Sequence, residues 1–165
     1  MRITTRGRYA LRASMALAKL GEKGLPVSIN TLSNEENVSA VFLEQIFFKL
    51  KKADIVRSVR GPGGGFAFAR PLDSISVREI FFAAGEELDV LPCDRSIEDC
   101  DRLSGCICHK LITSATGLIN KYFSEVSLQM LLVNKEFRPV TKEKRRVKKE
   151  KMPCSQSKRV GNKRC

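Results

Sequence analysis

The fold is decided by residues 39–69, which read SAVFLEQIFFKLKKADIVRSVRGPGGGFAFA. Ser39 suits the cap of a helix, because a serine hydroxyl accepts hydrogen bonds from the N–H groups of the first helical turn. The large apolar residues that follow recur at helical spacing and form one stripe: Leu43, Ile46, Phe47 and Leu50. We therefore expect a helix over residues 40–52 that buries this stripe.

Two short apolar segments come next, at residues 55–59 and 66–69, and a run with four glycines in five positions separates them. This pattern predicts two strands of a hairpin, or wing. A nucleotide-binding glycine loop is the alternative. Gly61-x-Gly63-x-x-Phe66 lacks its third glycine, however, and no helical pattern follows, so the wing is favoured.

The residues before this stretch predict two further helices. Apolar residues repeat at helical spacing over residues 8–20, and Gly21, Gly24 and Pro26 end the pattern. Ser28 suits the cap of a short second helix, and Asn37 suits a left-handed turn residue. Helix, tight turn and helix define a helix-turn-helix with residues 40–52 as its recognition helix. The expected fold class is mainly α with a small β-wing, followed by a long downstream helix.

The downstream helix is expected within residues 110–137. Its apolar positions lie at i, i+4, i+7 and i+11, and two isoleucines widen the stripe: Leu111, Ala115, Leu118 and Tyr122, with Ile112 and Ile119. A helix with such a stripe packs against a partner. The alternative is that this face packs on its own domain.

Three thiols and the single histidine of the chain fall within seventeen residues, as Cys93, Cys100, Cys106 and His109. Soft sulfur donors with an imidazole suit an iron–sulfur cluster or a zinc ion. Structural zinc sites usually contain cysteines in close pairs, separated by about two to four residues. Here six and five residues separate the three cysteines, which is not typical of zinc. Cys108 is an alternative to His109 as a ligand, and free thiols that sense oxidants are a third interpretation of the cysteines.

Composition places the chain in a compartment and rules out some functions. No long apolar run or secretory signal is present, so we expect a cytoplasmic protein with reduced cysteines and no membrane partner.

Residues 141–165 hold eleven lysines and arginines against two glutamates, so they carry most of the net charge of +12. This segment predicts a disordered basic tail that attracts phosphates. No catalytic triad or carboxylate pair indicates an enzyme or a small-molecule substrate.

Several of these motifs together resemble one family. They are MRIT at residues 1–4, GRYA at 7–10, FLEQIF at 42–47, SVRGPGGGF at 58–66, and the three cysteines with the histidine. In this order, over roughly residues 1–137, they resemble the winged-helix, iron–sulfur cluster-binding transcriptional regulators typified by the iron–sulfur cluster assembly regulator and the nitric-oxide-sensing repressor. The resemblance implies a homodimer that binds a double-stranded DNA operator, mainly as a repressor, with a cluster setting affinity or site choice.

Candidate DNA contacts lie on the recognition helix and the wing. Val41, Glu44, Gln45 and Phe48 point away from the buried stripe. Glu44 can accept a hydrogen bond from cytosine and Gln45 can pair with adenine, so these two are the expected base contacts. Arg60 and Gly61 are expected at the DNA backbone and minor groove. The expected phosphate contacts are Arg2, Arg8, Lys49 and Lys51.

The resemblance also implies the metal ligands. Cys93, Cys100 and Cys106 match the cysteines of the family, and His109 matches the histidine of the assembly regulator. Arg8 stands where the nitric-oxide-sensing branch offers an acidic ligand, and an arginine has no acceptor for a metal. We therefore expect the assembly-regulator type, with a two-iron (2Fe–2S) cluster favoured over a four-iron (4Fe–4S) one and zinc as the alternative.

The expected organisation is a DNA-binding domain at 1–84, a cluster-binding loop at 85–109, a dimerisation helix region at 110–137 and a basic tail at 138–165. Two other functions remain open. One is an iron–sulfur redox protein that uses its winged helix for protein contacts. The other is a cluster-free regulator that senses oxidants through its thiols.

Overall fold

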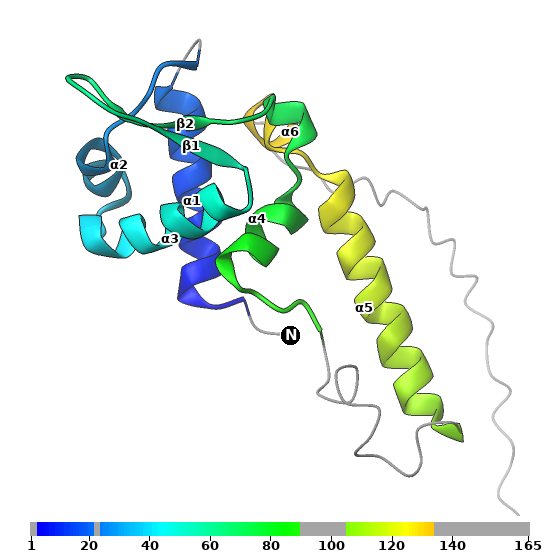
Figure 1. Cartoon of the computed structure of the whole chain (residues 1–165). Coiled ribbons are helices and arrows are strands. Elements are labelled where there is room, and N and C mark those ends of the chain that lie inside the picture. The colour runs from blue at the N-terminus through cyan, green and yellow to red at the C-terminus, as the bar shows by residue number, and fades with distance from the viewer. Residues whose placement is uncertain (1–2, 22–23, 90–104, 134–165) are drawn as a thin grey trace, which may run out of the picture.

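The computed structural model of the chain describes residues 3–21, 24–89 and 105–133. Six helices, a two-stranded sheet and a 3-10 turn at Leu72–Ser74 follow one another in these residues (Figure 1). Their bounds are α1 Thr5–Leu20, α2 Ile29–Glu36, α3 Ala40–Lys52, β1 Val56–Val59, β2 Gly65–Phe68, α4 Val77–Ala84, α5 Ile107–Glu125 and α6 Leu128–Val133. Among the described helices, none is long and apolar enough to cross a membrane.

Short polar side chains define the beginnings of the first three helices. The Ser28 hydroxyl accepts a hydrogen bond from the Thr31 N–H at 3.1 Å, and that of Ser39 accepts from the Phe42 N–H at 3.3 Å. Asn37 ends α2 in the left-handed region at φ 51°. The expected helix-turn-helix is therefore confirmed, with α3 covering the predicted range. Only α1 begins earlier than expected, because Thr4 caps a polar first turn that carries no apolar pattern.

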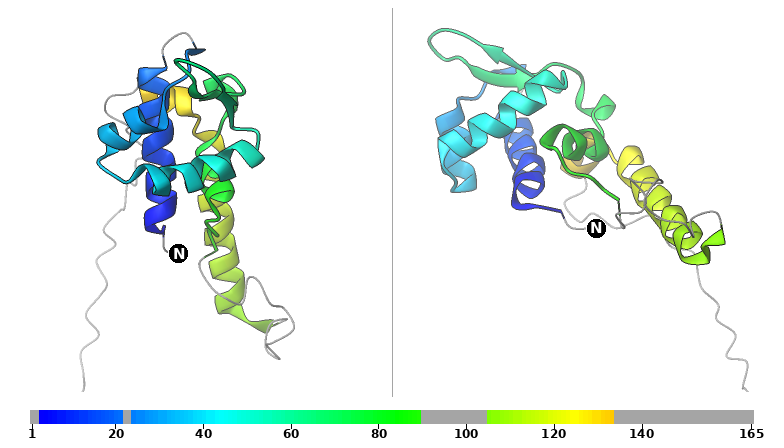
Figure 2. Two further views of the ribbon diagram at one scale, coloured as in Figure 1. Left: turned by 60° about the vertical axis from the view of Figure 1, so that its left-hand side comes forward. Right: turned by 60° about the horizontal axis from the view of Figure 1, so that its bottom comes forward.

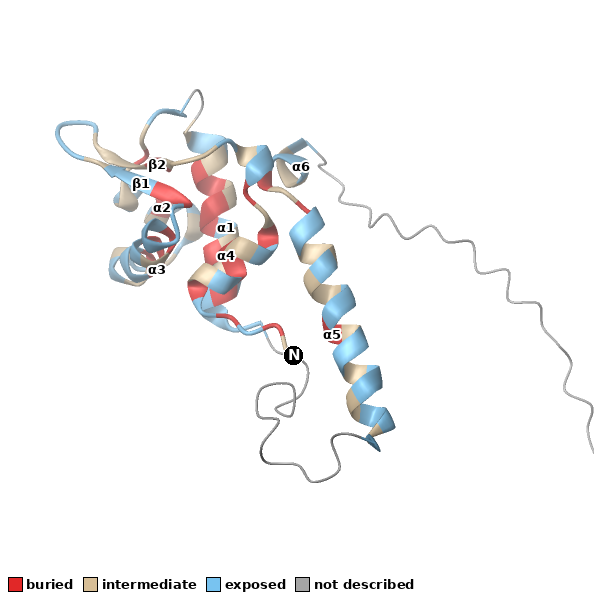
Figure 3. Cartoon of the chain, turned by 45° about the vertical axis from the view of Figure 1, so that its right-hand side comes forward, coloured by how far each residue is buried: buried red, intermediate tan, exposed pale blue. Residues whose placement is uncertain are grey.

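The core lies where α1, α2, α3 and α4 meet. The predicted stripe of α3 is fully buried there, together with Leu17 of α1, Leu32 of α2 and Ile80 of α4. Figure 3 shows buried residues concentrated on α1 and α4, whereas α5 is mostly exposed or half-buried. The faces of α3 that do not meet this core are therefore presented to solvent.

The wing is a β-hairpin, as expected. β1 pairs antiparallel with β2, with Val56 opposite Phe68 and Val59 opposite Gly65. Gly61 and Gly63 at the tip have φ values of 104° and 73°, which glycine adopts without strain. A further bridge joins Phe66 to Val27, so strand β2 of the wing is tied to the connection between α1 and α2. The tip projects from the helical body (Figure 2).

The downstream region holds two helices rather than one. α5 ends at Glu125, because Val126 is extended and its carbonyl accepts a hydrogen bond from the Val77 N–H at 2.9 Å. α6 then returns to the core, where Leu128 is fully buried. α5 itself lies beside α4 in Figures 1 and 2, and Phe123 stacks edge-on against Phe81 with the ring centroids 5.3 Å apart.

Candidate nucleic-acid interface and metal-ligand positions

The outward face of α3 is the first candidate surface. Burial of Leu43, Ile46, Phe47 and Leu50 leaves the opposite side of the helix in solvent. Glu44 and Gln45 are both exposed on that side, one or two turns from the N-terminus of the helix. A recognition helix meets base edges through residues in this position. The assignment of Glu44 to cytosine and Gln45 to adenine stays a prediction.

The wing lies next to this helix and is joined to it. The Lys51 ammonium donates a hydrogen bond to the Ser58 hydroxyl of β1 at 2.7 Å, which links the last turn of α3 to the first strand of the wing. Arg60 and Gly61 are exposed where the chain leaves β1 for the tip. A duplex that lies along α3 would therefore meet the wing on one side of the helix.

The expected phosphate contacts occupy different surroundings. Lys49 is half-buried, and its ammonium donates a hydrogen bond to the Ala84 carbonyl at 3.3 Å. Its positive charge therefore stabilises the C-terminal end of α4. Arg8 is exposed on α1, with its guanidinium carbon 5.4 Å from the centre of the Tyr9 ring. Arg2 lies outside the described residues. Lys52 was not among the candidates, yet it is exposed on α3 with its ammonium 4.8 Å from the centre of the Phe48 ring. The i, i+4 spacing of Phe48 and Lys52 is the signal that could have found it.

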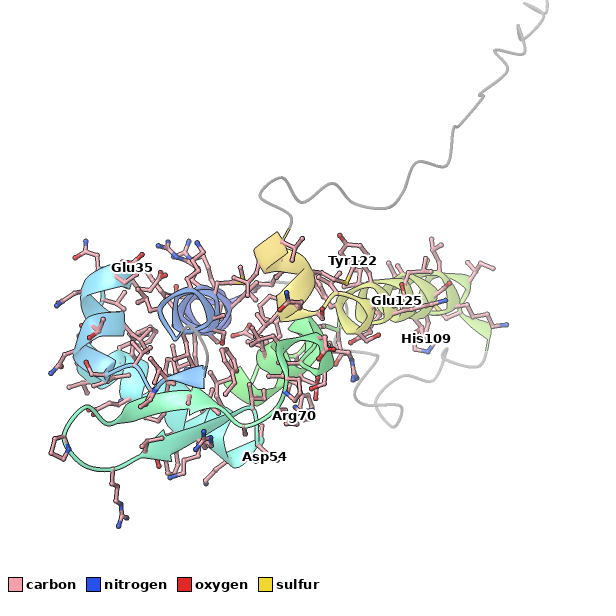
Figure 4. The ribbon with its side chains drawn as sticks, turned by 90° about the horizontal axis from the view of Figure 1, so that it is seen from above. Glu35, Asp54, Arg70, His109, Tyr122 and Glu125 are labelled. Carbon is pink, nitrogen blue, oxygen red and sulfur yellow. The ribbon has the colours of Figure 1, made fainter. Side chains whose placement is uncertain are left out.

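Two of the expected metal ligands occupy the beginning of α5. Cys106 is the N-cap, and its sulfur accepts a hydrogen bond from the His109 N–H at 3.4 Å. The hydroxyl of Thr113, one turn further on, lies 3.5 Å from Nε2 of His109. Cys108 is exposed, whereas Cys106 and His109 are half-buried. Figure 4 shows His109 on α5, well away from Glu35 of α2.

Cys93 and Cys100 lie outside the described residues, so their positions relative to Cys106 are not part of the structure. Within residues 3–21, 24–89 and 105–133, no three potential metal ligands come together. The donor chemistry at the start of α5 nevertheless fits a metal cluster. A sulfur and an imidazole three residues apart share one helical turn, and the N-terminus of a helix favours the negative charge of a thiolate.

α5 has one face against the protein and one in solvent. Its inner face meets α4, where Asn120 accepts a hydrogen bond from the guanidinium of Arg78 at 3.1 Å and Thr116 is buried. Its outer face carries apolar residues at i, i+4 and i+11: Ile107, Leu111 and Leu118. Leu111 and Leu118 are 69% and 68% exposed, so this stripe does not pack against the described residues of the same chain.

A recognition helix beside a hairpin wing defines a winged helix-turn-helix protein of the DNA-binding class. The sequence profile of the Rrf2 family, described as iron-dependent transcriptional regulators, matches residues 3–134. The chain belongs to this family, and it is a transcriptional regulator. The expected fold class and family are thus confirmed.

Individual relatives agree. A protein from Neisseria meningitidis described as an HTH-type transcriptional regulator is 38% identical over 132 residues, which are 80% of this chain and 88% of that protein. The HTH-type transcriptional regulator IscR of Photorhabdus laumondii is 36% identical over 132 residues, 80% of this chain and 79% of its own. The solved structure of T. potens IscR superimposes with a TM-score of 0.66 at 25% identity, covering 82% of this chain and 89% of that one.

Proposed function

We propose that the protein is a homodimeric regulator, mainly a repressor, whose affinity for its operator or choice between operators is set by an iron–sulfur cluster. The observation that carries this proposal is the structure of α5. One end of the helix presents Cys106 and His109, and its outer face presents an unpacked apolar stripe. Relatives named IscR and the iron-dependent description of the family support the same function.

Cys93, Cys100, Cys106 and His109 are the ligands we propose for the cluster, with Cys108 as the alternative to His109. Three thiolates and one imidazole suit a two-iron cluster, and a neutral imidazole ligand makes such a cluster easier to lose than a fourth thiolate would. When bound, the cluster would give the protein a sensor, because oxidants, nitric oxide or iron shortage can remove its iron. Zinc at the same ligands is the alternative.

The homodimer is proposed from the apolar stripe of α5. Burying Ile107, Leu111 and Leu118 against the same residues of a second copy would remove three large side chains from water, and each contributes about 1.5–3 kcal/mol when fully buried. A two-fold axis between the two copies would make this contact self-complementary. It also places two recognition helices in one particle, as two operator half-sites require.

Contacts between the helices give a route from the ligands to α3. α5 contacts α4 through Phe123 on Phe81 and through Asn120 on Arg78. The C-terminal end of α4 in turn accepts the Lys49 hydrogen bond from α3. A shift of α5 when its first turn gains or loses a metal would therefore be passed to the recognition helix. Such a coupling needs two arrangements of α4 and α5 with different affinities for DNA.

We also propose the division of the chain given by its sequence, with residues 1–84 binding DNA, 85–109 binding the cluster, 110–137 forming the dimer, and 138–165 adding phosphate attraction. Removing residues 138–165 should then weaken binding to all DNA sequences about equally and reduce its salt dependence.

The test begins with protein purified without oxygen. Visible absorption together with iron and sulfide analysis should show equal iron and sulfide, with both lost in Cys106→Ala. Cys154→Ala, a cysteine change outside the proposed ligand set, is the matched control and should keep them. DNA affinity is then measured for the two variants on the same duplex at one salt concentration. Colourless protein that contains zinc, or equal DNA affinity with and without the cluster, would contradict the proposal.

A further inference from the structure

Two apolar residues occupy the outward face of α3, where a DNA-facing helix ordinarily carries polar side chains. Val41 is 65% exposed and Phe48 is 58% exposed. They are seven residues apart, which is two turns, so they lie on the same line along the helix. Glu44 and Gln45 lie between them on this face. Apolar and polar groups therefore alternate along the surface that the recognition helix presents.

The surroundings of Phe48 are basic. The Lys52 ammonium lies 4.8 Å from the centre of its ring, and Lys51 is exposed on the side facing β1. An open groove of about 940 Å³ runs between α3 and α4, and Phe48 and Phe82 contribute to its lining with Lys49 and Lys52. A positive charge beside an exposed apolar ring suits a polyanion whose bases carry apolar groups.

We propose that Val41 and Phe48 are specificity-determining residues that contact the methyl groups of two thymines. The C5-methyl of thymine is the apolar group that the major groove offers, and aromatic and aliphatic side chains contact it. This inference rests on the proposed DNA-binding function, and it assigns the preference for thymine at two operator positions to Val41 and Phe48. Glu44 and Gln45 then read the polar edges of the bases between the two thymines.

The geometry of the helix adds a spacing. Seven residues of α-helix rise about 10.5 Å, and base pairs are stacked about 3.4 Å apart. With α3 lying along the groove, the two thymines are separated by about three base pairs. The Lys52 ammonium holds one face of the Phe48 ring, so the rest of the ring is left for the methyl group.

The test removes single methyl groups from DNA. Duplexes are selected by this protein from a random library, and each thymine is replaced in turn by deoxyuridine, which lacks only the methyl. Affinities are measured by fluorescence anisotropy at one salt concentration. Wild type should lose about fourfold in affinity at each contacted thymine, the equivalent of one buried methyl group.

The variants assign each contact to a side chain. Phe48→Ala should abolish the thymine preference at one position and keep it elsewhere, and Val41→Ala should do the same about three base pairs away. Phe48→Leu should keep part of the preference. Phe82→Ala is the matched control, since Phe82 is 76% exposed on α4, and it should leave every preference unchanged. Thermal unfolding verifies that all four variants fold.

Three outcomes would overturn the proposal. One is the same ratio of thymine to deoxyuridine affinity in wild type and Phe48→Ala at every position. A second is an equal effect of Phe82→Ala on the thymine preferences, which would show that they do not arise from a direct contact of Phe48 with a methyl group. The third is failure of the selection to enrich any sequence, and this result alone would also overturn the proposed DNA-binding function.

Discussion

Gly7 and Glu86 meet at the beginning of α1, seventy-nine residues apart in sequence. The Gly7 N–H donates to Oε1 of Glu86 at 3.0 Å, and a Cβ atom on Gly7 would lie 2.5 Å from Cγ of Glu86. The same carboxylate accepts from the Thr4 N–H at 2.9 Å and from the Thr4 hydroxyl, and Glu86 is 5% exposed. A buried carboxylate from the segment after α4 therefore caps α1 and neutralises its N-terminal dipole.

Replacing Gly7 by alanine should destabilise the fold by about 1–3 kcal/mol, because the new methyl group displaces Glu86 from the cap. Urea unfolding of the two proteins measures this difference. Gly117→Ala is the matched control: a Cβ there meets nothing within 4 Å, so the change should be neutral or raise stability by up to about 1 kcal/mol. Equal stability of Gly7→Ala and wild type would contradict the importance of the cap.

Glu79 should make stability depend on acidic pH. Its partial burial acts to raise its pKa, but hydrogen bonds from the Ser76 N–H, the Arg70 guanidinium and the Ser76 hydroxyl outweigh this, so the pKa lies below 4.5. A depressed folded-state pKa gives stability that is present above the unfolded value and is lost as pH falls through the folded value. The carboxylate is partly exposed, so the effect should be a few tenths of a kcal/mol.

The comparison of wild type with Glu79→Gln measures this effect. Thermal unfolding is followed from pH 6 to pH 3, and the difference in stability should shrink as the pH falls below about 4.5. Asp73→Asn, an exposed change nearby, serves as the control. A difference that stays constant over this range would show that Glu79 does not act through its charge.

Arg60 and Glu44 should affect DNA binding in different ways. Arg60→Ala removes a backbone or minor-groove contact, so affinity should fall for all sequences and the salt slope should decrease by about 1. Glu44→Ala should instead relax base preference at one position and cost about 1–3 kcal/mol on the selected site. Titrations at several salt concentrations separate the two effects. Glu35→Ala on α2 is the control, and a similar change in base preference there would count against Glu44.

The apolar stripe of α5 should hold two copies together. Leu118→Ser removes one large apolar side chain from the proposed contact, which should raise the dimer dissociation constant at least about tenfold. Sedimentation at several protein concentrations measures this constant. Leu25→Ser is the matched control, because Leu25 is also exposed but lies between α1 and α2. A monomeric wild-type protein at every concentration would exclude the dimer.

Local signals in the sequence were enough to predict much of the fold. Ser28 and Ser39 mark the beginnings of α2 and α3, because each hydroxyl accepts a hydrogen bond from an N–H three residues further on. Asn37 marks the end of α2, because it adopts the left-handed backbone conformation itself. The burial of the α3 stripe then determined that Glu44 and Gln45 face outward. These features need no knowledge of the rest of the chain.

Long-range contacts could not be predicted in this way. Nothing near Glu86 in the sequence indicates that it caps α1, since its partners are Thr4 and Gly7. The end of α5 at Glu125 depends on the hydrogen bond between Val77 and Val126, which joins residues far apart in sequence. For the metal ligands, Cys106 and His109 are placed at the start of α5, while the grouping of all four stays a prediction.

The bridge between Val27 and Phe66 separates the hairpin into two parts with different tolerance to change. The paired strands are hydrogen-bonded to the connection before α2, so residues inserted in the strands would displace the helix-turn-helix. The tip around Pro62 is exposed, and a Cβ on Gly61 or Gly63 meets nothing within 4 Å. A fluorescent label attached at position 62 would therefore report the approach of a duplex in real time without disturbing the packed helices.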